Sequence, residues 1–152
     1  MTTEAKPTPK TSTFSISGPY LSEGRLNIDL AQTDLMWLSL KVNAEGGENA
    51  VHAHTNEDHA FVVLEGEVTF FDENGDGKIL SQYEGILIPK GAYYRYLNTG
   101  ERNLFLLRIG AQKEGSGETR IKPDGSSIPG HTKENHHVDP VAIDGKFFGF
   151  GA

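Results

Sequence analysis

Residues 46–66 have the sequence GGENAVHAHTNEDHAFVVLEG, which contains three histidines, His52, His54 and His59. On an extended chain the side chains alternate between two faces, so His52 and His54 share one face. His59 opens the apolar run that follows, and the same alternation places Phe61 on its face, which we expect to point inward. Three inward imidazoles suit Zn, Fe, Ni or Cu better than Mg or Ca.

Short apolar runs at near-regular spacing lie on both sides of this segment. Turns rich in Gly, Asn and Asp separate them, and no stretch shows a sustained helical period. The runs predict strands at residues 35–42, 60–64, 67–71, 85–88, 93–97 and 104–109. We expect 60–64, 67–71 and 79–80 to be antiparallel neighbours, with a hairpin turn at 72–78. The pattern predicts an all-β sandwich or a closed barrel of the jelly-roll sort.

Length, charge and cysteine content exclude several classes of protein. The chain has 152 residues, which is the size of one domain. Its 21 acidic and 14 basic residues give a formal net charge of -7, and the basic residues are scattered, so we expect no nucleic-acid partner. The absence of cysteine excludes a disulfide framework, a thiolate zinc site and a cysteine nucleophile.

The two ends of the chain differ in composition from its middle. Residues 1–13 are polar and rich in Pro and Thr, which predicts a flexible tail without a signal peptide. No run approaches the roughly 18 apolar residues of a membrane span, so we expect no membrane partner and a cytoplasmic location. Residues 14–110 are expected to form the barrel domain. Residues 111–152 form a polar extension, and its aromatic end at 147–150 is expected to dock on the barrel or on a second subunit.

Two spacing patterns resemble the two sequence motifs of the cupins. The cupin forms are G-x5-H-x-H-x3-4-E-x6-G and G-x5-P-x-G-x2-H-x3-N. This chain has Gly46-x5-His52-x-His54-x4-His59-x6-Gly66 and Tyr83-x5-Pro89-x-Gly91-x2-Tyr94-x3-Asn98. The resemblance covers residues 35–109. It implies a small single-domain cupin of the RmlC-like superfamily, with the all-β double-stranded β-helix, or jelly-roll barrel, as its fold.

The chain departs from the cupin pattern at two ligand positions. His59 replaces the usual Glu, and Tyr94 replaces the usual second-motif His. The resemblance therefore implies one divalent transition metal ion held by His52, His54 and His59. Likeness in ligand type to the three-His iron centres of some cupin dioxygenases favours Fe, and Zn, Ni, Cu and Mn remain open. The alternative is a cupin that has lost its metal.

Tyr94 is the candidate catalytic residue, and its role has three alternatives. It could ligate the metal as phenolate, which requires the metal to displace a proton whose unperturbed pKa is about 10. It could stand beside the metal as a hydrogen-bond donor or acid/base, or be a buried core tyrosine with a satisfied hydroxyl. Of the nearby carboxylates, Asp58 is expected on the opposite face of the strand from Phe61. Glu57 is expected in the loop, where it reaches the site only if the bend differs.

Four residues are candidates for substrate binding. Phe61, Tyr96 and Asn98 are expected to share a partly aromatic pocket with Tyr94. Arg108 interrupts an otherwise apolar strand, and its guanidinium could bind a substrate carboxylate through two hydrogen bonds, or cap the barrel edge.

Other polar residues give weaker signals. Arg25 and Arg95 are further candidates to bind a carboxylate, although Arg95 should point outward if Tyr94 points in. Three more histidines lie near the C-terminus, where they could form a lid, a second metal site or a solvated loop; they are His131, His136 and His137.

The resemblance implies a metal-dependent enzyme that acts on a small organic molecule. An iron-dependent dioxygenase-type oxidoreductase is the first expectation. A Zn- or Ni-dependent lyase or isomerase is the second, and a non-catalytic cupin that binds a metabolite or sugar is the third, because cupins host many functions. Cupins are often dimers, and the aromatic strip at 147–150 adds to the expectation of a homodimer.

Overall fold

The computed structural model describes residues 2–112, 120–129 and 135–152, and all regular secondary structure in these ranges is β-strand. The strands are β1 (Ser17–Glu23), β2 (Arg25–Gln32), β3 (Met36–Asn43), β4 (Gly47–His54), β5 (Glu57–Glu65), β6 (Glu67–Phe71), β7 (Gly77–Ser81), β8 (Gly85–Ile88), β9 (Tyr94–Asn98), β10 (Leu104–Gln112), β11 (Arg120–Ile121) and β12 (Val141–Gly149). The described ranges contain no helix that could cross a membrane. The all-β prediction is confirmed.

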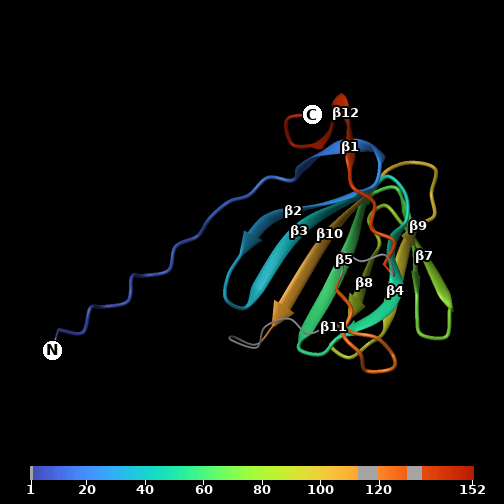
Figure 1. Ribbon diagram of the computed structural model, residues 1–152. Helices are drawn as coiled ribbons and strands as arrows, with labels where there is room; N and C mark the ends of the chain where they lie inside the picture. The colour runs from blue at the N-terminus through green and yellow to red at the C-terminus, as the bar shows by residue number, and fades with distance from the viewer. Residues whose placement is uncertain (1, 113–119, 130–134) are drawn as a thin grey trace.

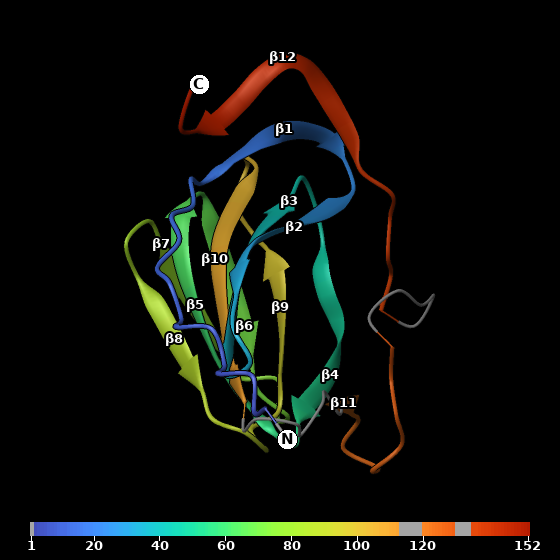
Figure 2. The same cartoon turned by 90° about the vertical axis from the view of Figure 1, so that its left-hand side faces the viewer.

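Two five-stranded sheets form the barrel (Figure 1). One has the strand order β2-β3-β10-β5-β8 and the other β11-β4-β9-β6-β7, and their strand pairs are antiparallel. Strands β1 and β12 form a separate two-stranded sheet at one end of the barrel (Figure 2). This arrangement is the jelly-roll barrel that the motif spacing predicts. Residues 2–13 have no secondary structure and extend away from the barrel (Figure 1).

Buried side chains form two apolar clusters on the two faces of the first sheet. The inner cluster fills part of the barrel; it consists of Phe61, Val63, Val68, Phe70, Ile88, Tyr94, Tyr96, Leu104 and Leu106. The outer cluster lies beneath β1 and β12 and is built on Leu21, Leu40, Val42 and Phe105. Alternation along β10 explains the division, because Leu104 and Leu106 face inward while Phe105 faces outward.

The chain changes sheets between β5 and β6, which corrects one prediction. The runs 60–64 and 67–71 are not paired neighbours, because β5 pairs with β8 and β10, whereas β6 pairs with β7 and β9. Gly66 makes the change of direction with φ of 91°. A side chain there would also meet the carbonyl oxygen of Asn103 at 2.6 Å, so both conformation and space require glycine. The pairing of β6 with β7 agrees with the prediction.

The C-terminal strand pairs with the N-terminal strand and packs on the barrel. Ser17 lies opposite Gly149 in the antiparallel β1–β12 pair. The ring of Phe148 stacks on that of Phe105 in β10, with centroids 4.2 Å apart and planes at 22°. In contrast, Phe147 and Phe150 are 58% and 77% exposed. One of the three terminal phenylalanines therefore holds this segment against the barrel.

Replacing Phe148 tests how much this docking stabilises the fold. We expect Phe148→Ala to lower the free energy of unfolding by about 2 kcal/mol, because it removes a half-buried ring from an aromatic stack. The matched control Phe147→Ala should change it by less than about 0.5 kcal/mol. Urea unfolding followed by circular dichroism measures both. Equal effects of the two variants would contradict the docking role of Phe148.

Tyr83 occupies the position at which the second cupin motif has glycine, and its backbone is in the left-handed region with φ of 72°. A residue with a Cβ pays about 1–2 kcal/mol there. The side chain is 83% exposed, so little packing is lost when it is removed. We expect Tyr83→Gly to raise the free energy of unfolding by about 1 kcal/mol.

The control for this prediction is Tyr83→Ala, which removes the ring but keeps the Cβ and its strain. Urea titration of the wild type and both variants should show a higher midpoint for the glycine variant alone. A stabilised alanine variant would instead assign the effect to the exposed ring.

Candidate metal centre

Two strands that follow each other in the chain, one from each sheet, bring the central polar residues together inside the barrel. His52 and His54 lie at the end of β4, and Glu57 and His59 lie at the start of β5. None of these four side chains is more than 3% exposed. Glu57 is the first residue of β5 rather than part of the preceding loop, so strand alternation places it on the same face as His59 and Phe61.

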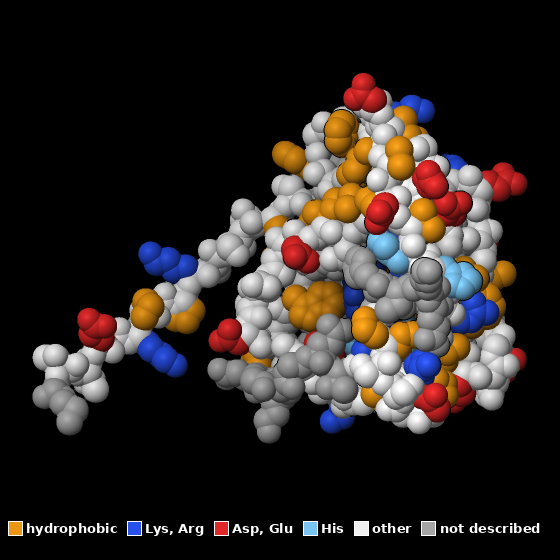
Figure 3. Space-filling view, viewed as in Figure 1, with side chains coloured by type: hydrophobic (Ala, Val, Ile, Leu, Met, Phe, Trp, Pro, Cys, Tyr) orange, Lys and Arg blue, Asp and Glu red, His pale blue; other side chains and the backbone are white. Residues whose placement is uncertain are grey.

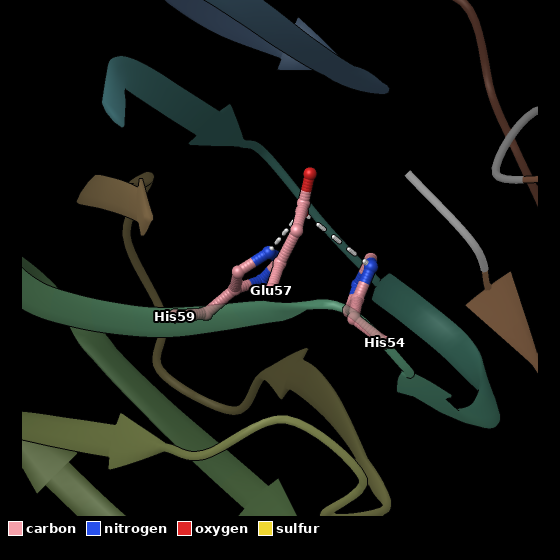
Figure 4. A group of neighbouring side chains, drawn as sticks. All are labelled: His54, Glu57 and His59. Atoms are coloured by element: carbon pink, nitrogen blue, oxygen red, sulfur yellow. Dashed lines mark hydrogen bonds and ion pairs between the residues drawn. The ribbon is translucent and has the colours of Figure 1, made fainter. Parts of the chain in front are cut away.

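Glu57 lies between two histidines and forms a compact group with them (Figure 4). Its Oε2 is 2.7 Å from Nε2 of His59 and 3.9 Å from Nδ1 of His54. The two imidazole rings have centroids 4.1 Å apart. One ligand atom from each residue lies within 4.8 Å of the others. We call His54, Glu57 and His59 the His-Glu-His group.

The chemistry of this group fits a divalent transition metal. Imidazole nitrogen and carboxylate oxygen are the donors that Fe, Zn and Ni accept, and two histidines with one carboxylate form a known iron ligand set. A buried carboxylate oxygen so close to an imidazole nitrogen requires a proton or a cation to compensate its charge. The residues present therefore fit a metal ion that all three would hold.

His52 lies beside this group but its nitrogens face other partners. Its Nδ1 is 2.8 Å from the carbonyl oxygen of Ala50. Its Nε2 is 3.3 Å from Oε2 of Glu48 and 3.1 Å from an Nη2 of Arg120. The ring remains 5.3 Å from that of His54, measured between centroids. A role for His52 as a metal ligand stays a prediction, and it requires its ring to turn from these partners.

Tyr94 stands opposite His52 in the β4–β9 pair. Its ring centroid is 4.5 Å from that of His52 and 6.3 Å from that of His54. The side chain is 3% exposed, and its hydroxyl has no hydrogen-bond partner among the described residues. Burial, assisted by the carboxylate of Glu48, raises the pKa of Tyr94 well above its usual value. The phenol is therefore protonated and available to donate a hydrogen bond.

The four predicted substrate residues lie in different surroundings. Phe61 belongs to the inner apolar cluster, with its ring 6.5 Å from that of His59. Asn98 shapes a turn, because its amide donates to the carbonyl oxygens of Asn43 and Arg102 at 3.0 and 2.9 Å. Tyr96 and Arg108 line a cavity of about 430 Å³, whose other lining residues include Ser127 and Asn135 of the C-terminal extension.

Arg108 is the predicted residue that comes closest to the His-Glu-His group. Its Nη2 is 3.3 Å from Nδ1 of His59. Its guanidinium lies over the ring of Trp37, 4.7 Å from the ring centroid. The ring of Trp37 in turn contacts that of His59 edge to face, with centroids 5.4 Å apart. Trp37 and Arg108 therefore position His59 from the side opposite Glu57.

A second charged group surrounds Glu48, the residue that sequence reasoning missed beside His52. Its carboxylate is 3.3 Å from Nζ of Lys41 and 3.5 Å from Nη2 of Arg120. Burial alone would raise the pKa of Glu48, but Lys41, the hydrogen bond with His52 and the arginines outweigh it and hold that pKa well below its usual range. Burial lowers the pKa of Lys41 to about 8, partly offset by Glu48.

The remaining candidates lie at the margin of the cavity or away from it. Arg25 lines the cavity, and its Nε donates to Nδ1 of His137 at 3.1 Å. Arg95 lies over the ring of Phe71, 4.1 Å from its centroid, on the outer side of β9. His136 is exposed. His131 lies outside the described residues.

A family model described as "Cupin domain" matches residues 40–110. Residues 40–110 are a cupin domain. The match contains both motifs, the second half of β3, all of strands β4 to β9 and most of β10. The cupin domain therefore holds the His-Glu-His group, Tyr94 and Arg108.

Comparison with known proteins agrees with this assignment. An uncharacterized protein of Aquifex aeolicus is 32% identical over 71 residues, which are 47% of this chain and 58% of that protein. The chain thus matches little more than half the length of this relative. A double-stranded β-helix protein of Klebsiella pneumoniae is 17% identical with a TM-score of 0.56, over 65% of this chain and 85% of that one.

Two further solved structures share the fold. KdgF of Halomonas is 17% identical with a TM-score of 0.58, over 69% of this chain and 97% of that chain. A sugar phosphate isomerase of Silicibacter pomeroyi is 18% identical with a TM-score of 0.56, over 80% and 97% of the two chains. Likeness at this level of identity shows the fold and does not transfer an activity.

The His-Glu-His group makes a prediction that separates it from the three-histidine set. We expect Glu57→Gln to weaken Zn(II) binding by about 10- to 100-fold or more, because a ligand atom and its negative charge are lost. Asp58→Asn is the matched control, since Asp58 is the next residue in β5 and is exposed on the opposite face. Competition with a chromophoric chelator measures the affinities of the purified proteins.

The same titration with His52→Ala decides whether this residue belongs to the metal centre. A loss equal to that of Glu57→Gln would add His52 to the ligands, and an unchanged affinity would leave it outside. If Glu57→Gln binds Zn(II) as tightly as the wild type while His52→Ala does not, the three-histidine set is correct and the His-Glu-His set is wrong.

Proposed function

We propose that the protein is a metal-dependent cupin enzyme that acts on a small organic molecule, and that it is an iron-dependent dioxygenase-type oxidoreductase. The observation that carries the proposal is the His-Glu-His group, buried in the barrel beside a cavity of ligand size. Two histidines and one carboxylate with open positions are the ligand set of many non-haem Fe(II) oxygenases, in which the metal activates oxygen. Zn, Ni, Cu and Mn are accepted by similar donors.

The chain's own residues provide the other requirements of such a site. Glu57 and His59 hold each other at 2.7 Å, and Arg108 and Trp37 fix the far side of the His59 ring. The inner apolar cluster below these residues excludes water from one side of the site. The protonated hydroxyl of Tyr94 can donate a hydrogen bond to a bound ligand, which is the role we propose for it.

A redox-inert alternative has one specific observation in its favour. The buried hydroxyl of Tyr94 has no hydrogen-bond partner among the described residues and its ring lies beside those of His52 and His54, so it is placed to exchange a proton or hydrogen bond with a bound substrate. Lyases and isomerases need an acid or base more than a redox metal. Two of the fold neighbours are described as sugar phosphate isomerases, one of them as putative. In this alternative Zn or Ni would take the place of iron at the same three ligands.

Assembly and location are further parts of the proposal. The exposed rings of Phe147 and Phe150 are consistent with a homodimer. A small-molecule substrate, the lack of a nucleic-acid or membrane partner and a cytoplasmic location remain expectations from the sequence.

Oxygen uptake by the iron-loaded protein tests the proposed reaction. We expect consumption of oxygen with at least one member of a panel of diketones, thiols and phenolic acids, and a loss of at least about 100-fold in Glu57→Gln, because the metal site is incomplete. Asp58→Asn should retain the activity.

Two outcomes would overturn the dioxygenase proposal. No oxygen uptake by the iron-loaded wild type across the panel would count against it, and isomerase or lyase activity of the Zn-loaded protein would then support the alternative. Failure of the wild type to bind any of these metals would overturn the metal-dependent function as a whole and favour a binding protein.

A further inference from the structure

The cavity next to the His-Glu-His group is lined by an excess of positive side chains. Four cationic residues line it, and Glu48 is the sole carboxylate among its described lining residues; the cations are Arg25, Lys41, Arg108 and Arg120. The whole chain carries a net charge of -7. On the face shown in Figure 3, acidic and basic side chains are interspersed over the surface. The concentration of cations in the cavity therefore contrasts with the protein around it.

Glu48 does not balance the charges of Lys41 and Arg120, because one carboxylate faces two cations. Its carboxylate is shared by Nζ of Lys41 at 3.3 Å, Nη2 of Arg120 at 3.5 Å and Nε2 of His52 at 3.3 Å. The side chains of Lys41 and Arg120 are only 13% and 14% exposed, so water screens them weakly. Buried charges of one sign are costly unless a counter-charge accompanies them. A bound anion would supply that counter-charge.

Two donors in the cavity wall also have no hydrogen-bond partner among the described residues. They are Nδ2 of Asn43 and Nε of Arg120, and both atoms are buried. Asn43 as a whole is 1% exposed, and its Oδ1 accepts from the hydroxyl of Tyr96 at 3.4 Å. A buried N–H group without an acceptor is unfavourable, and the oxygen atoms of a ligand would satisfy both groups.

The cationic wall is in direct contact with the histidines. Nη2 of Arg108 is 3.3 Å from Nδ1 of His59, and Nη2 of Arg120 is 3.1 Å from Nε2 of His52. An anionic group bound by Arg108 would therefore be separated from the His-Glu-His group only by the Arg108 side chain. The cavity of about 430 Å³ is at the small end of the range for ligand pockets, which suits a molecule of metabolite size.

We propose that this cavity binds a small organic anion, whose carboxylate or phosphate group is held by Lys41, Arg108 and Arg120. This inference rests on the proposed function in one respect, since it assigns the anion as the substrate class of the same site. Carboxylate and phosphate share the recognition chemistry, because both present several oxygens to guanidinium and ammonium donors. Binding of the anion itself does not require the metal.

Calorimetric titration of the metal-free protein tests the proposal. The probes are succinate, inorganic phosphate and glycerol, of which glycerol is the uncharged control. We expect succinate or phosphate to bind with a Kd that increases with the salt concentration, and we expect glycerol not to bind. The anion with the lower Kd identifies whether the cavity prefers a carboxylate or a phosphate group. Absence of binding by both anions at millimolar concentration would overturn the proposal.

Charge-removing variants locate the binding. Lys41→Gln and Arg120→Gln should each raise the Kd for the anion by about tenfold or more, since each removes a charge-assisted hydrogen bond. Lys90→Gln is the matched control, because Lys90 is exposed and lies outside the cavity. Circular dichroism verifies that the variants fold. Equal affinities of the Lys41→Gln and Lys90→Gln proteins, with Arg120→Gln also unchanged, would place the anion elsewhere and contradict the proposal.

Glu57→Gln separates this inference from the proposed function. This variant should lose metal affinity and keep anion affinity in the metal-free state. Anion binding without metal binding by the wild type would leave the inference standing and remove the metal-dependent function. Metal binding without anion binding would overturn the inference and leave the metal-dependent function standing.

Discussion

The contact between the carboxylate of Glu57 and the imidazole of His59, at 2.7 Å, is the interaction on which the polar half of the barrel depends. Strand β5 places both side chains on its inner face, in line with Phe61 and Val63 of the apolar cluster. A carboxylate at this depth is stable only with a proton or cation between it and its neighbours. The requirement explains why the imidazoles of His54 and His59 flank the carboxylate of Glu57.

Short apolar runs separated by turn residues were sufficient to predict an all-β sandwich or barrel, and the resemblance of the glycine, histidine and proline spacing to the cupin motifs narrowed this to the jelly-roll barrel. The same alternation rule could have placed Glu57 inside, since residues 57, 59, 61 and 63 share one face of an extended chain. The prediction missed it by starting the strand at Ala60, three residues late. Strand boundaries are set by pairing, and β5 gains its first residues by pairing with β10, where Gln112 lies opposite Glu57.

Other parts of the structure depend on contacts between distant segments, which local patterns do not contain. Strand β12 pairs with β1 across most of the chain length, and Phe148 has the same local sequence context as Phe147 although only one of them stacks on Phe105. The segment before β12 runs along β4 (Figure 2), where Oδ1 of Asn135 accepts from the backbone N–H of Ala50 at 2.9 Å. These contacts join segments that are far apart in the sequence, so they form only in the folded barrel and local sequence patterns do not predict them.

The orientation of His59 follows from packing on a glycine. Gly110 lies opposite Trp37 in the β3–β10 pair, and a Cβ at position 110 would overlap the indole ring. Without that Cβ, the ring lies across β10, where it contacts both the guanidinium of Arg108 and the imidazole of His59. Arg108 is thereby held between an aromatic face and a histidine, with its charge directed to the cavity that it lines. The apolar packing of one strand pair thus fixes both a member of the His-Glu-His group and the cation next to it, which couples that group to the proposed anion site.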